Sequence, residues 1–414
     1  MPERMTQERS TGDILSSGQF HAGVNRMRDL VEGGSLRTLR LQQVKLADLA
    51  EQVEKKIREN YPDLQIPPDS CWRSMERGGI DRFGILTSSR AFETEQAFFR
   101  AAADLAVMCT LADGLMPEDW TFLDPLSGER MEGRQAGPVA AAVMFASGAF
   151  SSDPADPFRA DAFALSRITQ DEVMTGFQFG GEAHAGTAEK LARQFNRLGE
   201  IIALRPDLFE DGQEIRPAIL MEQARIAMVG PVLPVGTLFD AVLDGFAPIW
   251  DGGAEIGDRI LGDVWPASME DTGADGERVA FHLPAAAMCL NMIEPFGWTG
   301  CGLSELDKLP APSDADHAAV MVDAGVLIIN TGETADPARL AAELRASTMI
   351  LTDDLARMVR GHLGVSEEDL PLACILEAGT RPLAQALLVK NPELLARLGR
   401  NMNPGGVFWL PFGA

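Results

Sequence analysis

The sequence of 414 residues has few of the residues that disulfide-bonded and metal-dependent proteins rely on. It contains five cysteines and five histidines. The cysteines are odd in number, widely spaced and mostly surrounded by apolar residues, which indicates buried thiols rather than disulfides or a Cys-x-x-Cys metal site. The zinc-protease motif His-Glu-x-x-His is absent as well. We therefore expect no metal site.

Long hydrophobic runs and an excess of positive charge are also missing. No run of about 18 apolar residues occurs, so no membrane span is predicted. Acidic residues number 61 against 36 basic ones, for a formal net charge of −25. Because a nucleic acid has to be met by a basic surface, we do not expect one as a partner. A small anionic ligand remains possible, since one or two arginines suffice for a single phosphate.

The sequence lacks the common nucleotide-binding and hydrolase motifs. Gly-x-Gly-x-x-Gly after a strand, Gly-x-x-x-x-Gly-Lys-[Ser/Thr] and Gly-x-Ser-x-Gly are all absent, so we expect no cofactor. The pair Asp353 and Asp354 is similar to the acidic pair of phosphoribosyltransferases. It lies inside a helical pattern, however, and has no small, Thr-rich loop to hold a pyrophosphate. A phosphoribosyltransferase is therefore the least favoured alternative.

Helical periodicity dominates what the sequence does contain. Over residues 44–59, apolar side chains recur every three or four positions and charged side chains occupy the opposite face. Strand signals are few, such as residues 326–329. The pattern predicts an all-α protein with a single large helical domain over residues 16–400, a disordered tail over 1–15 and a C-terminal tail over 401–414. The charged N-terminus has no apolar segment typical of a secretion signal, so we expect a cytoplasmic protein. The oligomeric state is not predicted. Further helices are predicted over residues 20–31, 91–112, 137–147, 187–204, 215–229, 237–249, 337–362 and 381–398.

The stretch 279–330 combines an apolar helix with several polar side chains. Pro284 and Pro295 are expected to mark the two ends of one short helix, which is apolar nearly all the way round and therefore buried. His282 precedes this helix, and a polar loop carrying Asp314, Asp316 and His317 follows it. Carboxylates and imidazoles at the rim of an apolar core are suited to a catalytic site. The same residues can equally be helix caps and solvated loop positions.

Asp104 is a second candidate because it lies in an almost wholly apolar part of the helix predicted over 91–112. Burying an unpaired carboxylate is costly, so Asp104 must have either a partner or a functional role. Trp120 and Trp265, which flank turns and loops, can stack on a ligand or simply pack.

Seven phrases, in order along residues 30–376, resemble the uracil-catabolism family, long described as a domain of unknown function from fungal and bacterial pyrimidine-degradation clusters. The family is similar in layout to queuosine-nucleotide N-glycosidases, which are helical proteins resembling DNA glycosylases. The resemblance implies an N-ribosyl hydrolase that cleaves ribosylurea, its phosphate or a related small nucleoside or nucleotide. The phrases are ENYPDLQIP followed by WR and GGIDR, DLAVMCTLADG with a trailing DW, GAFSSDP, LGDVW, FH, EP and DAGVL.

The resemblance also implies roles for individual residues. The loop carboxylate that stabilises an oxocarbenium-like sugar corresponds to Asp314, with Asp316 as its substitute. Asp104 would hold the ribose hydroxyls or the attacking water, and Arg134 would meet a phosphate. The expected substrate-binding set is His282, Arg134, Trp120, Asp263 and His317.

This chain departs from the family pattern at several polar positions. The family has Tyr-Arg-Asn-Gly-Gly after the loop carboxylate, where this chain has Ala-Asp-His-Ala-Ala over residues 315–319. A Lys and a Gln after His282 are replaced by apolar residues. Asp69 and Cys71 stand in place of a His and an Arg, and Arg381 stands in place of a Trp. These departures leave two further alternatives open, a different substrate and a non-catalytic nucleoside-binding protein.

Overall fold

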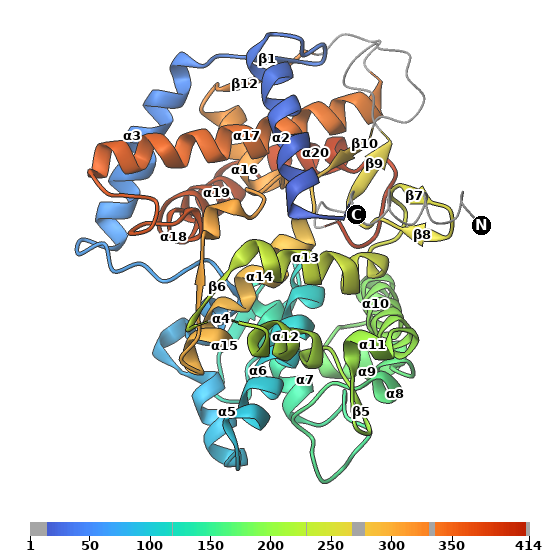
Figure 1. Ribbon diagram of the computed structural model, residues 1–414. Helices are drawn as coiled ribbons and strands as arrows, with labels where there is room; N and C mark the ends of the chain where they lie inside the picture. Colours follow the sequence, from blue (N-terminus) through green and yellow to red (C-terminus); the bar gives the residue numbers. More distant parts are fainter. Residues whose placement is uncertain (1–14, 118, 229, 267–277, 331–335, 411–414) are drawn as a thin grey trace.

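The computed structural model describes residues 15–410 except 118, 229, 267–277 and 331–335, and it is mainly helical, as predicted (Figure 1). Residues 1–14, most of the predicted N-terminal tail, and 411–414 lie outside the described residues. The helices are α2 (Ser17–Glu32), α3 (Val44–Asn60), α4 (Cys71–Met75), α5 (Arg82–Arg90), α6 (Glu95–Asp113), α7 (Gly137–Ala146), α8 (Ala162–Leu165), α9 (Gln170–Gly176), α10 (Ala185–Leu204), α11 (Pro206–Phe209), α12 (Ala218–Ile226), α13 (Val235–Phe246), α14 (Leu283–Asn291), α15 (Ile293–Trp298), α16 (Ala315–Asp323), α17 (Pro337–Leu363), α18 (Leu372–Ile375), α19 (Arg381–Lys390) and α20 (Pro392–Met402).

The strands in the described part of the chain are short and form two-stranded pairs. β6 and β11 are parallel and the other pairs are antiparallel. The predicted strand over 326–329 corresponds to β12, which pairs with β1. The pairs are β1 (Leu39–Leu41) with β12 (Leu327–Ile329), β2 (Thr121–Leu123) with β3 (Arg130–Glu132), β4 (Glu210–Asp211) with β5 (Glu214–Ile215), β6 (Val232–Pro234) with β11 (Gly302–Ser304), β7 (Glu255–Ile256) with β8 (Arg259–Ile260), and β9 (Val264–Pro266) with β10 (Arg278–Ala280).

The helices surround one continuous hydrophobic core, to which both Leu15 and Leu410 belong. Figure 1 shows α3, α16, α17, α19 and α20 in the upper part of the view, α6, α7, α10 and α12 in the lower part, and α13 and α14 between them. The small residues of α7 allow it to pack closely along α6. Both α6 and α7 are buried over most of their length because their side chains are almost all apolar.

The central helix α14 is buried, as its sequence predicted, but it does not run to Pro295. It ends at Asn291, and Pro295 lies in the first turn of the next helix, α15. A proline is tolerated there because the first N–H groups of a helix have no partner within the helix. The side chain of Asn291 accepts from the Cys71 N–H at 2.7 Å and donates to the Thr110 hydroxyl at 2.8 Å. These bonds join α14 to α4 and α6.

The helix predicted over 381–398 is also two helices, α19 and α20. Asn391 separates them, and its side chain accepts from the Leu394 N–H, so it caps α20 with Pro392 in the first turn. Before α19 the chain forms a π-helical turn, Leu376–Thr380, which we call the π turn. The stretch Leu372–Lys390 is long and apolar enough to span a membrane, but 56% of it is buried, as in core helices that pass the same test.

Candidate functional site

Six charged residues from distant parts of the chain form one network of ion pairs, which we call the Arg381 network. Arg381, the first residue of α19, directly follows the π turn. Asp314 caps α16 and Asp316 lies in its first turn. The remaining members come from the start of α4, the end of α6 and the turn before α7. The Arg381 network consists of Asp69, Asp113, Arg134, Asp314, Asp316 and Arg381.

Two arginines link the carboxylates of the network. Arg381 Nη1 lies 3.1 Å from Asp314 Oδ2 and 3.3 Å from Asp316 Oδ2, and its Nε lies 3.0 Å from Asp69 Oδ2. Arg134 Nη1 lies 3.3 Å from Asp316 Oδ2, and its Nη2 lies 3.1 Å from Asp113 Oδ2. Asp316 is therefore shared between the two guanidinium groups.

Asp314 is the buried member of the network. Its Oδ1 accepts from the His317 N–H at 2.9 Å and lies 2.7 Å from His317 Nδ1. His317 Nε2 in turn lies 2.9 Å from the Thr380 hydroxyl, which ties α16 to the π turn. Burial alone would raise the pKa of Asp314, but the charges of His317 and Arg381 outweigh it and hold the pKa well below its usual range.

The other members reach solvent. The side chain of Asp314 is 4% exposed, whereas those of Asp69, Arg134, Asp316 and Arg381 are 20–25% exposed. A small molecule could therefore approach Asp316 and the two guanidinium groups from solvent. Asp314 is suited to orienting its neighbours.

Glu377 lies beside the network on the π turn. Its Oε1 lies 3.5 Å from the hydroxyl of Tyr61, the only tyrosine of the chain. Burial, together with repulsion from Asp69, raises the pKa of Glu377 to about 7. A second carboxyl nearby, that of Glu294, accepts from Arg73 at 2.5 Å. Burial raises the pKa of Glu294 despite this ion pair.

Asp104 lies in a separate ion pair rather than in the Arg381 network. Its carboxylate accepts from Arg216 at 2.7 Å and from the N–H groups of Ala160 and Ala218 at 2.9 and 2.8 Å. The side chain is fully buried, and burial raises its pKa even beside Arg216. Asp104 thus joins α6 to the segments that precede α8 and α12.

Asp263 is linked through Arg345 to the loop that carries Asp314. Its two oxygens accept from Arg345 at 2.8 and 2.7 Å. Burial would raise the pKa of Asp263, but the charge of Arg345 outweighs it and lowers the pKa. Arg345 also donates to the hydroxyl of Ser313 at 3.1 Å, next to Asp314 in the chain. The Asp263–Arg345 pair therefore braces the loop that carries Asp314.

His282 and Trp120 are buried among aromatic rings. His282 has a left-handed backbone (φ 50°), and its ring lies 5.9 Å from those of Phe20 and Phe239. Burial lowers the pKa of His282 to about 4. The indole N–H of Trp120 donates to the Phe177 carbonyl at 3.0 Å. Neither residue has a hydrogen bond to the Arg381 network among the contacts of the described residues.

Asp353 and Asp354 lie within α17, as the helical pattern predicted. Asp353 pairs with Arg28 of α2 at 2.7 Å, and Asp354 contacts Arg28 and Arg357. The pair therefore fastens two helices together.

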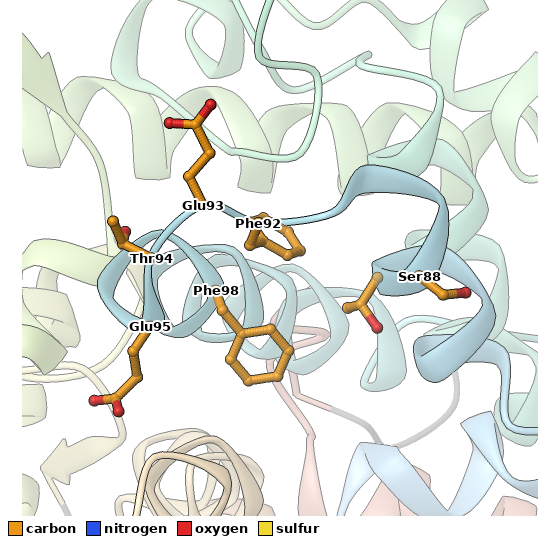
Figure 2. Close-up of a pocket in the computed structure, with 7 residues that line it drawn as sticks. Ser88, Phe92, Glu93, Thr94, Glu95 and Phe98 are labelled. Atoms are coloured by element: carbon orange, nitrogen blue, oxygen red, sulfur yellow. The ribbon is translucent and has the colours of Figure 1, made fainter.

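A surface hollow of about 440 Å³ lies between α5 and α6, away from the residues of the Arg381 network (Figure 2). Figure 2 shows Phe92, Glu93 and Thr94 on the chain that joins the two helices, Glu95 and Phe98 on α6, and Ser88 on α5. Over the described ranges, no group of three or more His, Cys, Asp or Glu is placed to hold a metal ion.

Sequence reasoning assigned no functional role to Asp69, Asp113, Glu377 or Arg381. Asp69 and Arg381 were noted only as departures from the family pattern. The structure pairs these two departures with each other at 3.0 Å. The signal that could have found them was the complementary charge of the two replacements. An acid, Asp69, stands in place of the family's His, and a base, Arg381, stands in place of the family's Trp.

Comparison with known proteins gives a family match and two relatives. The family model described as a protein of unknown function (DUF1688) matches residues 15–387. "Uracil catabolism protein 4" of Lachancea kluyveri is 25% identical over 364 residues, which cover 79% of this chain and 82% of the relative. "Protein urg3" of Schizosaccharomyces pombe is 24% identical over 396 residues, which cover 89% of this chain and 91% of the relative.

Proposed function

We propose, from the premise that this chain belongs to the family described as a protein of unknown function (DUF1688), that it is an N-ribosyl hydrolase of uracil catabolism. The name of one relative, "Uracil catabolism protein 4", supports the role in uracil catabolism. The proposed substrate is ribosylurea, its phosphate or a related small nucleoside. No cofactor is proposed.

The observation that carries the proposal is the Arg381 network itself. Asp314, Asp316, Arg134 and His317 were selected from the sequence, and they meet in one partly exposed cluster although Arg134 and Asp316 are 182 positions apart. Enzymes that break a bond between a sugar and a leaving group need a carboxylate beside the anomeric carbon. The network offers such carboxylates, one of which, Asp316, is partly exposed to solvent.

In the proposed reaction, the bond between ribose C1′ and the leaving nitrogen breaks, and a water oxygen bonds to C1′. Asp316 is the carboxylate assigned to the sugar, because it is partly exposed and its ion pairs with Arg134 and Arg381 are both 3.3 Å long. Its negative charge would stabilise the positive charge that develops on the sugar ring. Asp314 acts indirectly, by holding His317 and Arg381 in place.

Purified protein incubated with ribosylurea is expected to release urea, measured by a coupled urease assay, and free ribose, measured as reducing sugar. Asp316→Asn should lower kcat/KM on the order of 100-fold, since it removes the charge that stabilises the transition state. Asp314→Asn should lower it too. Asparagine also caps helices well, so this variant keeps α16.

The matched control is Asp353→Asn, which removes an Asp–Arg ion pair on α17 outside the network. This variant should retain full activity. Full activity in both Asp314→Asn and Asp316→Asn would contradict the assignment, as would the absence of urea release when the unmodified protein is incubated with ribosylurea and with its phosphate.

One observation favours the alternative of a non-catalytic nucleoside-binding protein. Arg381 engages three carboxylates at once, which neutralises part of the charge that catalysis would use. Under this alternative, calorimetry would detect binding of ribosylurea or a nucleoside with no release of urea. The phosphoribosyltransferase alternative has no comparable support, because Asp353 and Asp354 lie inside α17 and form ion pairs with Arg28 of α2 and Arg357 of α17.

A further inference from the structure

The π turn carries two polar groups, Glu377 and Thr380, and directly precedes Arg381 of the network. It interrupts the helical run between α18 and α19, and such one-turn π segments are frequent at functional sites. Thr380 at its end contacts His317, and Arg381 follows at once. Glu377 lies near the start of the turn, and its carboxyl group has no role in the reaction as proposed above.

The π turn is held tightly against α3. A Cβ atom on Gly379 would lie only 2.7 Å from Val53 Cγ1 and 3.3 Å from Ile57 Cγ1, so the backbone approaches α3 more closely than other residues would allow. The side-chain amide of Asn60 donates to the Ala378 carbonyl at 3.0 Å. These contacts fix the position of Glu377 relative to the network.

The titratable and charged groups that face Glu377 come from each element packed around it. Tyr61, in the loop after α3, is within 3.5 Å. The charges of Asp69 and Arg73 at α4 and of Arg381 of α19 act on Glu377. The charge of Glu377 in turn acts on Cys374 of α18. Glu377 thus lies half-buried at the junction of the network with the Tyr61 loop.

We propose that Glu377 is the general acid of this site and donates its carboxyl proton to the leaving nitrogen of the ribosyl substrate. This inference rests on the proposed hydrolase function. As the C1′–N bond breaks, the bonding electrons pass to the nitrogen, which takes the proton of Glu377 and leaves as a neutral amide or urea. A water oxygen then bonds to C1′, and the proton that this water loses restores the carboxyl group of Glu377.

The local environment suits this role. An acid that donates a proton at neutral pH works best when its pKa is near the working pH, and burial raises the pKa of Glu377 to about 7. Asp316 complements it as the carboxylate assigned to the sugar. Two carboxyl groups with different environments and different roles are typical of enzymes that cleave glycosidic bonds.

The single tyrosine allows a direct test that does not depend on activity. Protein labelled with ¹³C at the tyrosine ζ carbon should give one resonance, that of Tyr61, whose chemical shift follows the ionisation of Glu377 next to it. We expect an inflection near pH 7 that is absent in Glu377→Gln. Asp69→Asn should move the inflection to lower pH, because it removes a repelling charge.

The pH profile of urea release tests the role itself. In the unmodified protein kcat/KM should fall tenfold per pH unit above about pH 7, because the proton of Glu377 is lost. Glu377→Gln should lower kcat/KM by about 10²–10⁴-fold and abolish that limb of the profile. Glu59→Gln, a half-exposed carboxylate of α3 paired with Lys56, is the control and should behave as the unmodified protein does.

The outcomes separate this inference from the function on which it rests. No urea release from the unmodified protein overturns the hydrolase function. Urea release that is undiminished in folded Glu377→Gln, or a Tyr61 inflection below pH 5, overturns the role of Glu377 and leaves the hydrolase function standing. Circular dichroism of each variant establishes that it is folded.

Discussion

At the scale of single residues, carboxylates paired with arginines occur in two environments, the buried interior and the edge of solvent. Asp104 and Asp263 are almost fully buried and each accepts two or more hydrogen bonds from an arginine and the surrounding groups. Asp316 and Asp69 share arginines at the edge of solvent. The first group is suited to holding segments together, and the second is suited to meeting a ligand.

Asp104→Asn tests this division. The change removes the buried charged partner of Arg216, which keeps the partly exposed Glu214 at 3.4 Å, and breaking one side of a buried ion pair costs about 3–5 kcal/mol of the free energy of unfolding. Urea denaturation followed by circular dichroism measures this loss. The control Asp211→Asn removes an exposed partner of Arg100 and should cost less than about 1 kcal/mol. A folded, equally stable Asp104→Asn variant without activity would instead support the catalytic role predicted from the sequence.

At the scale of elements, the π turn and the N-terminus of α16 together build the candidate site. Asp314 caps α16 and binds His317 one turn later, and His317 contacts Thr380 of the π turn. The two elements are therefore joined through a buried hydrogen-bonded chain. The packing of the π turn against α3 decides where Glu377 and Arg381 lie.

Gly379→Ala should disturb this arrangement. The added methyl group meets Val53 of α3 at 2.7 Å, and overpacking of this kind costs about 1–3 kcal/mol. Because the π turn has to shift, kcat/KM for urea release should fall as well. Gly361→Ala is the control, since its added methyl group meets nothing within 4 Å in α17 and should stabilise the protein slightly, by about 0.5–1 kcal/mol. Unchanged stability and activity in Gly379→Ala would show that the π turn tolerates displacement.

At the scale of the whole molecule, negative charge dominates both the chain and the candidate site. The formal net charge is −25, and the Arg381 network joins four carboxylates through two arginines. Arg134, which the resemblance assigned to a phosphate, is already paired with Asp113 and Asp316. A phosphate would have to displace those carboxylates.

We therefore expect uncharged ribosylurea to be a better substrate than its phosphate. Repulsion between an anionic substrate and the acidic protein is screened by salt, so kcat/KM for the phosphate should rise between 0.01 and 0.5 M salt, whereas the value for ribosylurea should stay nearly constant. Urea release measured over this range of salt for both compounds provides the comparison. A preference for the phosphate at all salt concentrations would contradict the prediction.

The sequence by itself determined the helical class and the positions of most of the long helices, whereas the segment of Asp316 and His317, predicted as a polar loop, belongs to α16. The spacing of apolar residues along α3 and the unbroken apolar character of α6 and α14 are local signals, and each was sufficient to predict a helix and its buried face. The boundaries at Pro295 and Pro392 were wrong, because a proline can begin a helix as well as end one, whereas the helix starts predicted at Pro284 and Pro337 were confirmed.

Only the tertiary structure decided which polar residues meet. Asp104 and Asp314 look alike in the sequence, each a carboxylate beside an apolar run, but the fold gives one to Arg216 and the other to His317 and Arg381. Glu377 had no local signal at all, since burial on the π turn is what raises its pKa. Hydrophobic periodicity is a local property of the residues of one helix, whereas the pairing of charges depends on how several helices pack against one another.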